Sequence, residues 1–286
     1  MKKTLLAIAL ALTVSAQAQT NDSIDTAQFV AVYEYLINTT NPEGDEVTDS
    51  VQMAVLIGNH TTKYIEFNRA MMHDFGEWRD RDYQMGDWNA SIYNLPVIYM
   101  NHPEGKMSSF DKIVPYRYLI IDNIPSIDWI LSEDTLTIGG YLCRKAIGKY
   151  AGRTWTAWYA EDIPSSAGPW KLRGLPGLIL KAADTENIFS FSIDQLVKKN
   201  GPIIYMSEMD HQKVSLRKFI AQRNKTFCSK RYVKNPRYYI PDGALDDAVE
   251  MWPGGPEPPA EEKLTVIARD LIVPKKVNVY QPLELK

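Results

Sequence analysis

The stretches TWTAWYA at residues 154–160 and FSFSI at residues 189–193 decide the fold class of this 286-residue chain. In both, the side chains alternate in character at every second position, which is the pattern of a β-strand that buries one of its faces. Trp155 and Trp158 fall on opposite sides of the first strand, so one of them is expected in the core. Residues 178–182 form an apolar run between the two stretches, and all three segments predict neighbouring antiparallel strands.

Similar alternation extends the predicted sheet along the chain. It marks residues 29–37, 51–57, 64–68, 116–122 and 136–150, the last with an interruption at Gly139-Gly140. Residues 92–100 are also extended. Because Pro96 has no backbone N–H to donate, this segment is expected at an edge or a bulge of the sheet.

Two segments have the spacing of amphipathic helices. Apolar residues recur at i, i+4 and i+7 within residues 69–82, and residues 213–225 form the strongest helix candidate. We therefore expect a mainly β protein of the α+β type, with a curved antiparallel sheet and two or three helices on one face. The unit around Trp158 and Leu178 is similar to the half-barrels of lipoprotein carriers, in which a curved sheet cups an apolar ligand. This likeness concerns the fold alone.

The N-terminus has the three parts of a secretory signal peptide. Lys2 and Lys3 supply the positive charge, residues 5–14 the apolar run, and Ala16-Gln17-Ala18 the cleavage signal. This apolar run is too short to span a bilayer, which needs ~20 residues. We expect a signal peptide at residues 1–18, a single mature domain over residues 19–286, and a periplasmic or secreted protein that does not span the membrane.

The composition is that of a folded domain without a nucleic-acid footprint. Apolar residues make up 45% and charged residues 23% of the chain, so it can bury a core. The formal net charge of −3 gives no reason to expect nucleic acid. A basic segment at residues 213–237 precedes an acidic one at residues 242–262, which contains a Pro-rich loop at residues 253–259. The basic helix is interpreted as a solvated face, a contact with anionic lipid headgroups, or a docking face for the acidic segment.

Cys143 and Cys228 are the two cysteines of the chain. Disulfides persist in extracytoplasmic compartments, and a bridge that closes so long a loop would stabilise the fold by ~4–5 kcal/mol on the chain-entropy model. Two separate buried thiols are the other interpretation, because the sequence does not show whether the side chains meet.

The segment from residue 140 to residue 179 carries a family resemblance. It contains GYLCRKA (140–146), GRTWTAWY (152–159), GPWK (168–171) and the hexapeptide Gly174-Leu175-Pro176-Gly177-Leu178-Ile179. In order and spacing these resemble the GLPGLI family, a Porphyromonas-type family of exported proteins of unknown function, whose usual ending is similar to YQPLEL at residues 280–285. The resemblance implies an exported protein of a double-membraned bacterium with a β-rich fold, and it implies no activity.

The hexapeptide also has a physical interpretation. Proline fixes φ and glycine permits positive φ, so the segment is expected to be a rigid, sharply turned connection. Leu175, Leu178 and Ile179 can anchor that connection in the core. The functional alternative is that the turn frames the mouth of a cavity.

Three kinds of function remain for the other side chains. Trp155, Trp158 and Trp170 are candidates for an apolar ligand pocket, with core packing and loop anchoring as the alternative. The pattern M-x-x-M-x-H has ligand types that suit Cu(I), although methionine is also a common core filler. It consists of Met206, Met209 and His211.

A hydrolase is the third possibility. The chain has no G-x-S-x-G, H-E-x-x-H, C-x-x-C or phosphate-loop pattern, and Ser165-Ser166 lies outside any such motif. We therefore assign no catalytic residue and no cofactor. The leading prediction is a non-enzymatic binding protein for an apolar small molecule or for an outer-membrane or other envelope protein. A copper-binding protein and a hydrolase are the alternatives.

Overall fold

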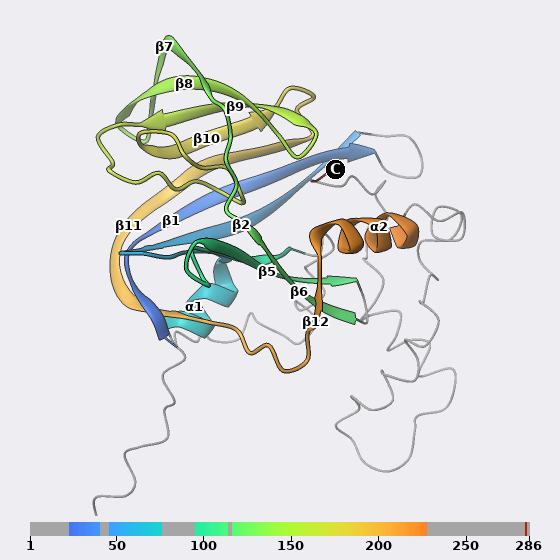
Figure 1. The fold of residues 1–286 in the computed structure, drawn as a ribbon. Coiled ribbons are helices and arrows are strands. Elements are labelled where there is room, and N and C mark those ends of the chain that lie inside the picture. Colours follow the sequence, from blue (N-terminus) through green and yellow to red (C-terminus); the bar gives the residue numbers. More distant parts are fainter. Residues whose placement is uncertain (1–22, 41–45, 76–94, 114–115, 228–283, 285–286) are drawn as a thin grey trace, which may run out of the picture.

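The computed structural model describes residues 23–40, 46–75, 95–113, 116–227 and 284 (Figure 1). The strands are β1 (Ser23–Thr40), β2 (Glu46–Gly58), β3 (Thr62–Glu66), β4 (Val97–Met100), β5 (Lys106–Ile113), β6 (Tyr116–Asn123), β7 (Ile130–Ile138), β8 (Tyr141–Tyr150), β9 (Arg153–Ala160), β10 (Leu178–Asp184), β11 (Phe189–Ile204) and β12 (Gln212–Val214). The helices of the described residues are α1 (Phe67–Phe75) and α2 (Leu216–Phe227).

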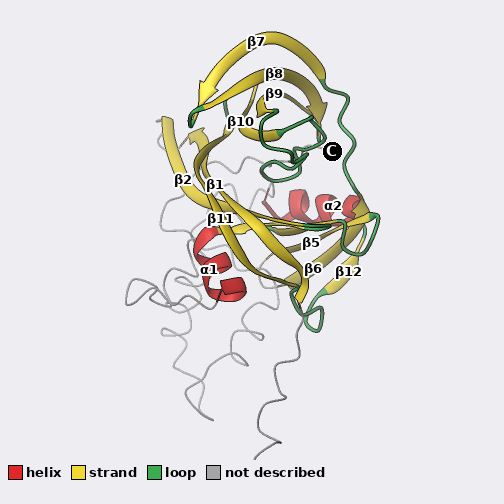
Figure 2. Cartoon of the chain, turned by 90° about the vertical axis from the view of Figure 1, so that its left-hand side faces the viewer, coloured by secondary structure: helices red, strands yellow, loops and turns green. Residues whose placement is uncertain are grey.

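All twelve described strands belong to one open, curved sheet (Figures 1 and 2). Their order is β12-β6-β5-β4-β3-β2-β1-β11-β10-β9-β8-β7. The long strands β1 and β11 pair antiparallel and join the two halves of the sheet. The three-residue β12 runs parallel to β6, because the chain crosses from β11 to the far edge before it forms β12. The sheet is therefore curved and mainly antiparallel, as expected, but mixed, because β12 and β6 pair in parallel.

The main core lies on the concave face of the sheet. It unites Tyr33 and Val55 from the long central strands with Trp155 of β9 and Phe191 of β11. Side chains from both halves of the sheet can meet in one cluster because the sheet bends toward this face. Each large apolar side chain buried here contributes ~1.5–3 kcal/mol, so this cluster dominates the stabilisation of the bend.

The two helices cover opposite faces of the sheet (Figure 2). Ala70 and Met71 of α1 pack into the cluster on the convex face, whereas Phe219 of α2 packs against Ile120 of β6. Ile120 is aligned through β5 with Ile98, which belongs to the concave core. The expectation of two or three helices on one face is thus wrong for the described residues. An amphipathic pattern identifies the apolar side of a helix but not the face of the sheet that it covers.

Most predicted strands lie where the alternation places them, but residues 67 and 68 belong to α1 and residues 213 and 214 to β12 instead of the predicted helix. Pro96 precedes β4 instead of interrupting it, so β4 is an interior strand between β3 and β5 and not an edge strand. The predicted signal peptide at residues 1–18, the acidic segment at residues 242–262 with its Pro-rich loop at residues 253–259, and Cys228 lie outside the described residues.

Neither α1 nor α2 is a membrane span. Within the described part of the chain, no helix has the length and apolar character needed to cross a bilayer.

Candidate functional site

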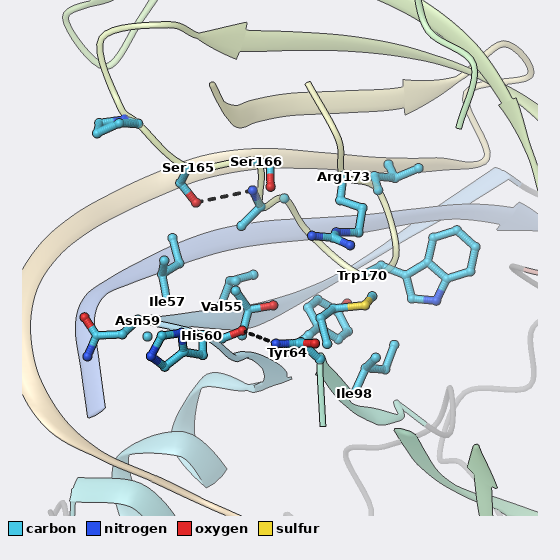
Figure 3. A pocket seen from close by; sticks show the side chains of 18 residues that line it. Val55, Ile57, Asn59, His60, Tyr64, Ile98, Ser165, Ser166, Trp170 and Arg173 are labelled. Carbon is cyan, nitrogen blue, oxygen red and sulfur yellow. Dashed lines mark hydrogen bonds between the residues drawn. The ribbon is translucent and has the colours of Figure 1, made fainter. Parts of the chain in front are cut away.

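A pocket of about 240 Å³ lies on the concave face, between the sheet and the loop that joins β9 to β10 (Figure 3). Its floor is formed by side chains of β2, β3 and β4, namely Val55, Ile57, Tyr64, Ile98 and Met100. Its roof is residues 164–173 of the loop, which we call the roof loop. Asn59, His60, Thr62 and Asn101 also line the pocket on the side of the sheet, and serines and an arginine line it on the side of the roof loop. The pocket therefore combines an apolar patch on its floor with a largely polar rim.

Close backbone contacts hold the roof loop in one conformation. The N–H of Ile179 in β10 donates to the carbonyl oxygen of Ala167 at 3.1 Å. Gly168 leaves no room for a side chain, since a Cβ there would lie 2.5 Å from the carbonyl oxygen of Leu172. The roof loop is folded on itself and tied to the sheet, so it forms a fixed wall of the pocket.

The hexapeptide at residues 174–179 connects the roof loop to β10. Gly174 has φ +92°, a conformation that favours glycine. Gly177 passes so close to β9 that a Cβ would lie 2.2 Å from the carbonyl oxygen of Ala160. Leu175, Leu178 and Ile179 are buried in the concave core, and Pro176 is exposed. The hexapeptide is thus a turned, core-anchored connection, and the residue directly before it lines the pocket.

The partly exposed carboxylate of Asp25 fixes the β2–β3 turn at one end of the pocket. Oδ2 of Asp25 accepts the backbone N–H groups of His60 at 2.7 Å and Thr61 at 2.8 Å. Gly58 allows this approach, because a Cβ there would lie 2.4 Å from the same oxygen. Burial raises the pKa of Asp25, but the donated backbone N–H groups outweigh it and lower the pKa below its usual value of 3.8. The pocket end formed by Asn59 and His60 therefore depends on an ionised Asp25.

Arg173 gives the pocket its charge. Among the lining residues it is the only arginine or lysine, and no aspartate or glutamate lines the pocket. Trp129 Nε1 donates to the carbonyl oxygen of Arg173 at 2.8 Å, which fixes its backbone. The side chain extends from the roof loop toward Val55 and Tyr64 (Figure 3). Partial burial lowers the pKa of Arg173, and within the described residues no carboxylate offsets this desolvation.

The three predicted tryptophans occupy three different places. Trp170 is buried and lines the pocket. Trp155 is fully buried behind it, with the two ring centroids 5.9 Å apart. Trp158 lies on the opposite side of β9 and is partly exposed, with the Nζ of Lys145 5.9 Å from its ring centroid. Only Trp170 of the three borders the pocket, while Trp155 supports it from the core.

A buried ion pair lies behind Trp170, on the side of the indole ring away from the pocket. The Nζ of Lys171 lies 5.6 Å from the ring centroid of Trp170 and is bonded to the carboxylate of Glu284. Arg223 of α2 donates to the backbone carbonyl oxygen of Glu284 at 2.6 Å. The roof loop, α2 and Glu284 therefore meet behind the indole ring and hold it against the pocket.

The residues proposed for copper have dissimilar surroundings. Met206 packs partly buried against the convex cluster, whereas Met209 is 86% exposed. The ring of His211 stands edge-on to Phe110 with the centroids 4.9 Å apart. The described residues also contain no group of three or more His, Cys, Asp or Glu side chains that could hold a metal ion. Copper binding by Met206, Met209 and His211 stays a prediction without a formed site.

The thiol of Cys143 is buried on β8. Its Sγ lies 3.6 Å from the carbonyl oxygen of Tyr141. Because Cys228 lies outside the described residues, the disulfide stays a prediction.

The pocket brings together two residue types that a hydrolase would use. Ser165, Ser166 and His60 all line it. An activated nucleophile requires a base within ~2.6–3.2 Å of its hydroxyl. Among the described residues no serine–histidine hydrogen bond is formed here, and Oγ of Ser165 instead accepts the backbone N–H of Ala167 at 3.3 Å. No carboxylate among the lining residues orients the imidazole of His60.

Arg173 and the floor of the pocket are not predicted by the sequence motifs. Arg173 stands between GPWK and the hexapeptide, and a charged residue in a stretch so rich in glycine and proline was a usable signal. The floor had none, because Val55, Tyr64 and Ile98 have the same alternation as ordinary core positions.

Comparisons with known proteins give little beyond this geometry. No curated protein matches the chain. Solved structures of PNGF-II in the P21 and C2 space groups match with TM-scores of 0.44 and 0.43 at 14% sequence identity. The matches cover 69% and 70% of this chain and 32% of each of those chains, so the chain spans about a third of the length of these relatives.

A family model matches the part of the chain that forms the roof of the pocket. The match covers residues 149–181, which run from the end of β8 through β9 and the roof loop into β10. This segment is similar to the family described as "Protein of unknown function (Porph_ging)".

Proposed function

We propose that the protein is an exported, non-enzymatic binding protein of the GLPGLI family, which holds a small molecule with an apolar body in the pocket beneath the roof loop. The single observation that carries this proposal is the pocket itself, an apolar floor of β-strand side chains closed by a rigid loop. Ligand pockets are typically concave and mostly apolar, with a few polar groups that fix orientation. The predicted signal peptide at residues 1–18 supports export.

The fixed conformation of the roof loop favours this proposal over a chance surface hollow. A preformed wall loses little conformational entropy when a ligand binds. The Lys171–Glu284 ion pair and the core-anchored hexapeptide hold the loop from two sides. An envelope protein as partner, copper binding and hydrolysis are outcomes that the following experiment distinguishes.

Native mass spectrometry of the gently purified full-length protein tests the proposal, alongside metal analysis. Thr62 lines the pocket, and Thr62→Phe places a ring in it. Thr137 is an exposed residue of β7, so Thr137→Phe is the matched control. We expect a co-purified small molecule on the wild type and on the Thr137→Phe variant, and its loss from the Thr62→Phe variant.

Other results would redirect the assignment. Equal retention by both variants would place the ligand outside the pocket. Stoichiometric copper would favour Met206, Met209 and His211. A bare protein that also binds no added apolar probe would contradict the proposal and leave the envelope partner as the next candidate.

A further inference from the structure

We infer that the ligand is an amphipathic carboxylate, whose charged head is bound by Arg173 and whose apolar chain lies on the floor of the pocket. This inference rests on the proposed function and goes beyond it by naming the chemical class of the ligand. Arginine presents a planar fork of N–H donors that matches a carboxylate. One positive charge in the lining fits a monoanion.

Three of the buried cations in this fold support the inference, while a fourth, Arg223, donates to the backbone carbonyl oxygen of Glu284. Lys63, Arg153 and Lys171 have side chains that are 0%, 4% and 4% exposed, and each forms an ion pair with a carboxylate of the chain. Burial without such a partner is costly for a charged group. Arg173 is partly buried, its pKa is lowered by desolvation, and no described carboxylate contacts it. The carboxylate that pairs with Arg173 is therefore expected to come from the ligand.

The rest of the lining fits a molecule with two unlike ends. Beyond the guanidinium, the roof side offers the hydroxyl groups of Ser165 and Ser166. On the floor, burial raises the pKa of Tyr64, so its hydroxyl stays a neutral hydrogen-bond donor. Val55 and Ile98 lie around it and offer only apolar surface. Arg173 and the serines on the roof and the aliphatic patch on the floor give an anionic head and an apolar tail separate places, while Asn59, His60 and Asn101 line the polar rim.

The volume of the pocket limits the length of that tail. Drug-sized ligands occupy pockets of roughly 300–1,000 Å³, and this one measures about 240 Å³. A short or medium-chain acid fits, as does one end of a longer chain that continues into solvent. Octanoate is therefore a suitable probe, and octanol and octylamine differ from it essentially in the head group.

Isothermal titration calorimetry of the full-length protein with these three probes tests the inference. We expect octanoate to bind more tightly than octanol, and octylamine to bind most weakly. Arg173→Met should weaken octanoate binding about tenfold to a hundredfold, which is the loss expected for a charge-assisted hydrogen bond. The same variant should leave octanol binding nearly unchanged. Arg173→Lys keeps the charge but not the fork, so its loss should be smaller.

The controls separate failure of this inference from failure of the proposed function. Arg217 is an exposed arginine of α2, and Arg217→Met should leave all three affinities unchanged. If octanol binds as tightly as octanoate and Thr62→Phe abolishes both, the pocket binds apolar molecules but the carboxylate inference is wrong. If Thr62→Phe leaves octanoate binding intact, or if none of the probes binds, both the inference and the proposed pocket function fail.

Discussion

Lys63 is fully buried on one face of the sheet, and Arg173 is partly buried on the other. The two cations differ in the partners that the described residues offer them. On the convex face, the Nζ of Lys63 contacts both carboxylate oxygens of Asp74 at 2.8 and 2.7 Å and the carbonyl oxygen of Ile204 at 3.0 Å. On the concave face, Arg173 borders a pocket and has no carboxylate partner among the described residues. Among the described residues, Lys63 thus has a carboxylate partner, although burial still lowers its pKa to about 8, whereas Arg173 has none and faces the pocket.

We therefore regard Lys63 as a structural charge and Arg173 as a charge that is available to a ligand. Asp74 lies in α1, Lys63 in β3 and Ile204 at the end of β11, and Asp74 also accepts the backbone N–H of Ile204 at 2.8 Å. The pair therefore joins three elements on the convex face. Among the described residues, the side chain of Arg173 joins no comparable set of elements, and we explain its partly desolvated position by ligand binding.

The largest effect is expected from Asp74→Ala. This change leaves Lys63 buried and unpaired, and removing one partner of a buried ion pair costs about 3–5 kcal/mol. Urea unfolding of the wild type and the variant measures the change in the free energy of unfolding.

The double variant Lys63→Met/Asp74→Leu is the control for that prediction. It removes both charges, so it should recover most of the lost stability, because apolar replacement of a whole buried pair is often neutral. A loss below about 1 kcal/mol for Asp74→Ala would be typical of an exposed pair and would remove the contrast between the two faces.

An intermediate effect is expected from acidification, through Asp25 at the end of the pocket. The pKa of Asp25 is below its usual value of 3.8 because the backbone N–H groups that it accepts outweigh burial. The folded protein then binds this proton less tightly than the unfolded chain does. The contribution of Asp25 to stability is complete above about pH 4 and is lost as the pH falls through the lower folded pKa.

The free energy of unfolding, measured from pH 6 down to the acid transition, checks this. We expect Asp25→Asn to lower stability near neutral pH and to reduce the dependence on pH in the acid range. Because Asp25 is fixed by backbone groups and not by a cation, high salt should change its effect little. An unchanged acid slope in the variant would show that other carboxylates govern this transition.

The sequence predicted the sheet better than it predicted the pocket, for physical reasons. Alternation along β9 and β11 reports which side of each strand is buried, and the structure buries that side. The central strands β1 and β2 instead bury both faces, with Val30 and Leu56 in the convex cluster, because helix α1 covers that side. The same alternation cannot tell a core position from a pocket floor, since both need apolar side chains on one face. Trp170 could be predicted from the sequence as a pocket residue because it stands in a loop, where a large aromatic side chain needs a packing partner.

The positions of the helices and strands in space were harder to predict from the sequence. The apolar stripe of α1 does not say which face of the sheet it covers, and the ion pair of Lys63 with Asp74, which fixes the answer, joins residues from two elements. Pro96 predicts a strand at an edge or a bulge of the sheet. It lies just before β4, where no ladder hydrogen bond from it is required, so β4 occupies the interior.

The smallest effect on stability is expected from Arg173→Met, and it completes the comparison with Asp74→Ala. The change removes no ion pair among the described residues and relieves the desolvation of a guanidinium, so the free energy of unfolding should stay within about 1 kcal/mol of the wild type. Urea unfolding without ligand measures this, and octanoate should then stabilise the wild type more than the variant, since a ligand that binds only the folded state shifts the equilibrium by mass action. A loss of 3 kcal/mol or more would make Arg173 a structural cation like Lys63. Stability retained together with loss of octanoate stabilisation would instead assign the uncompensated charge on the concave face to the ligand.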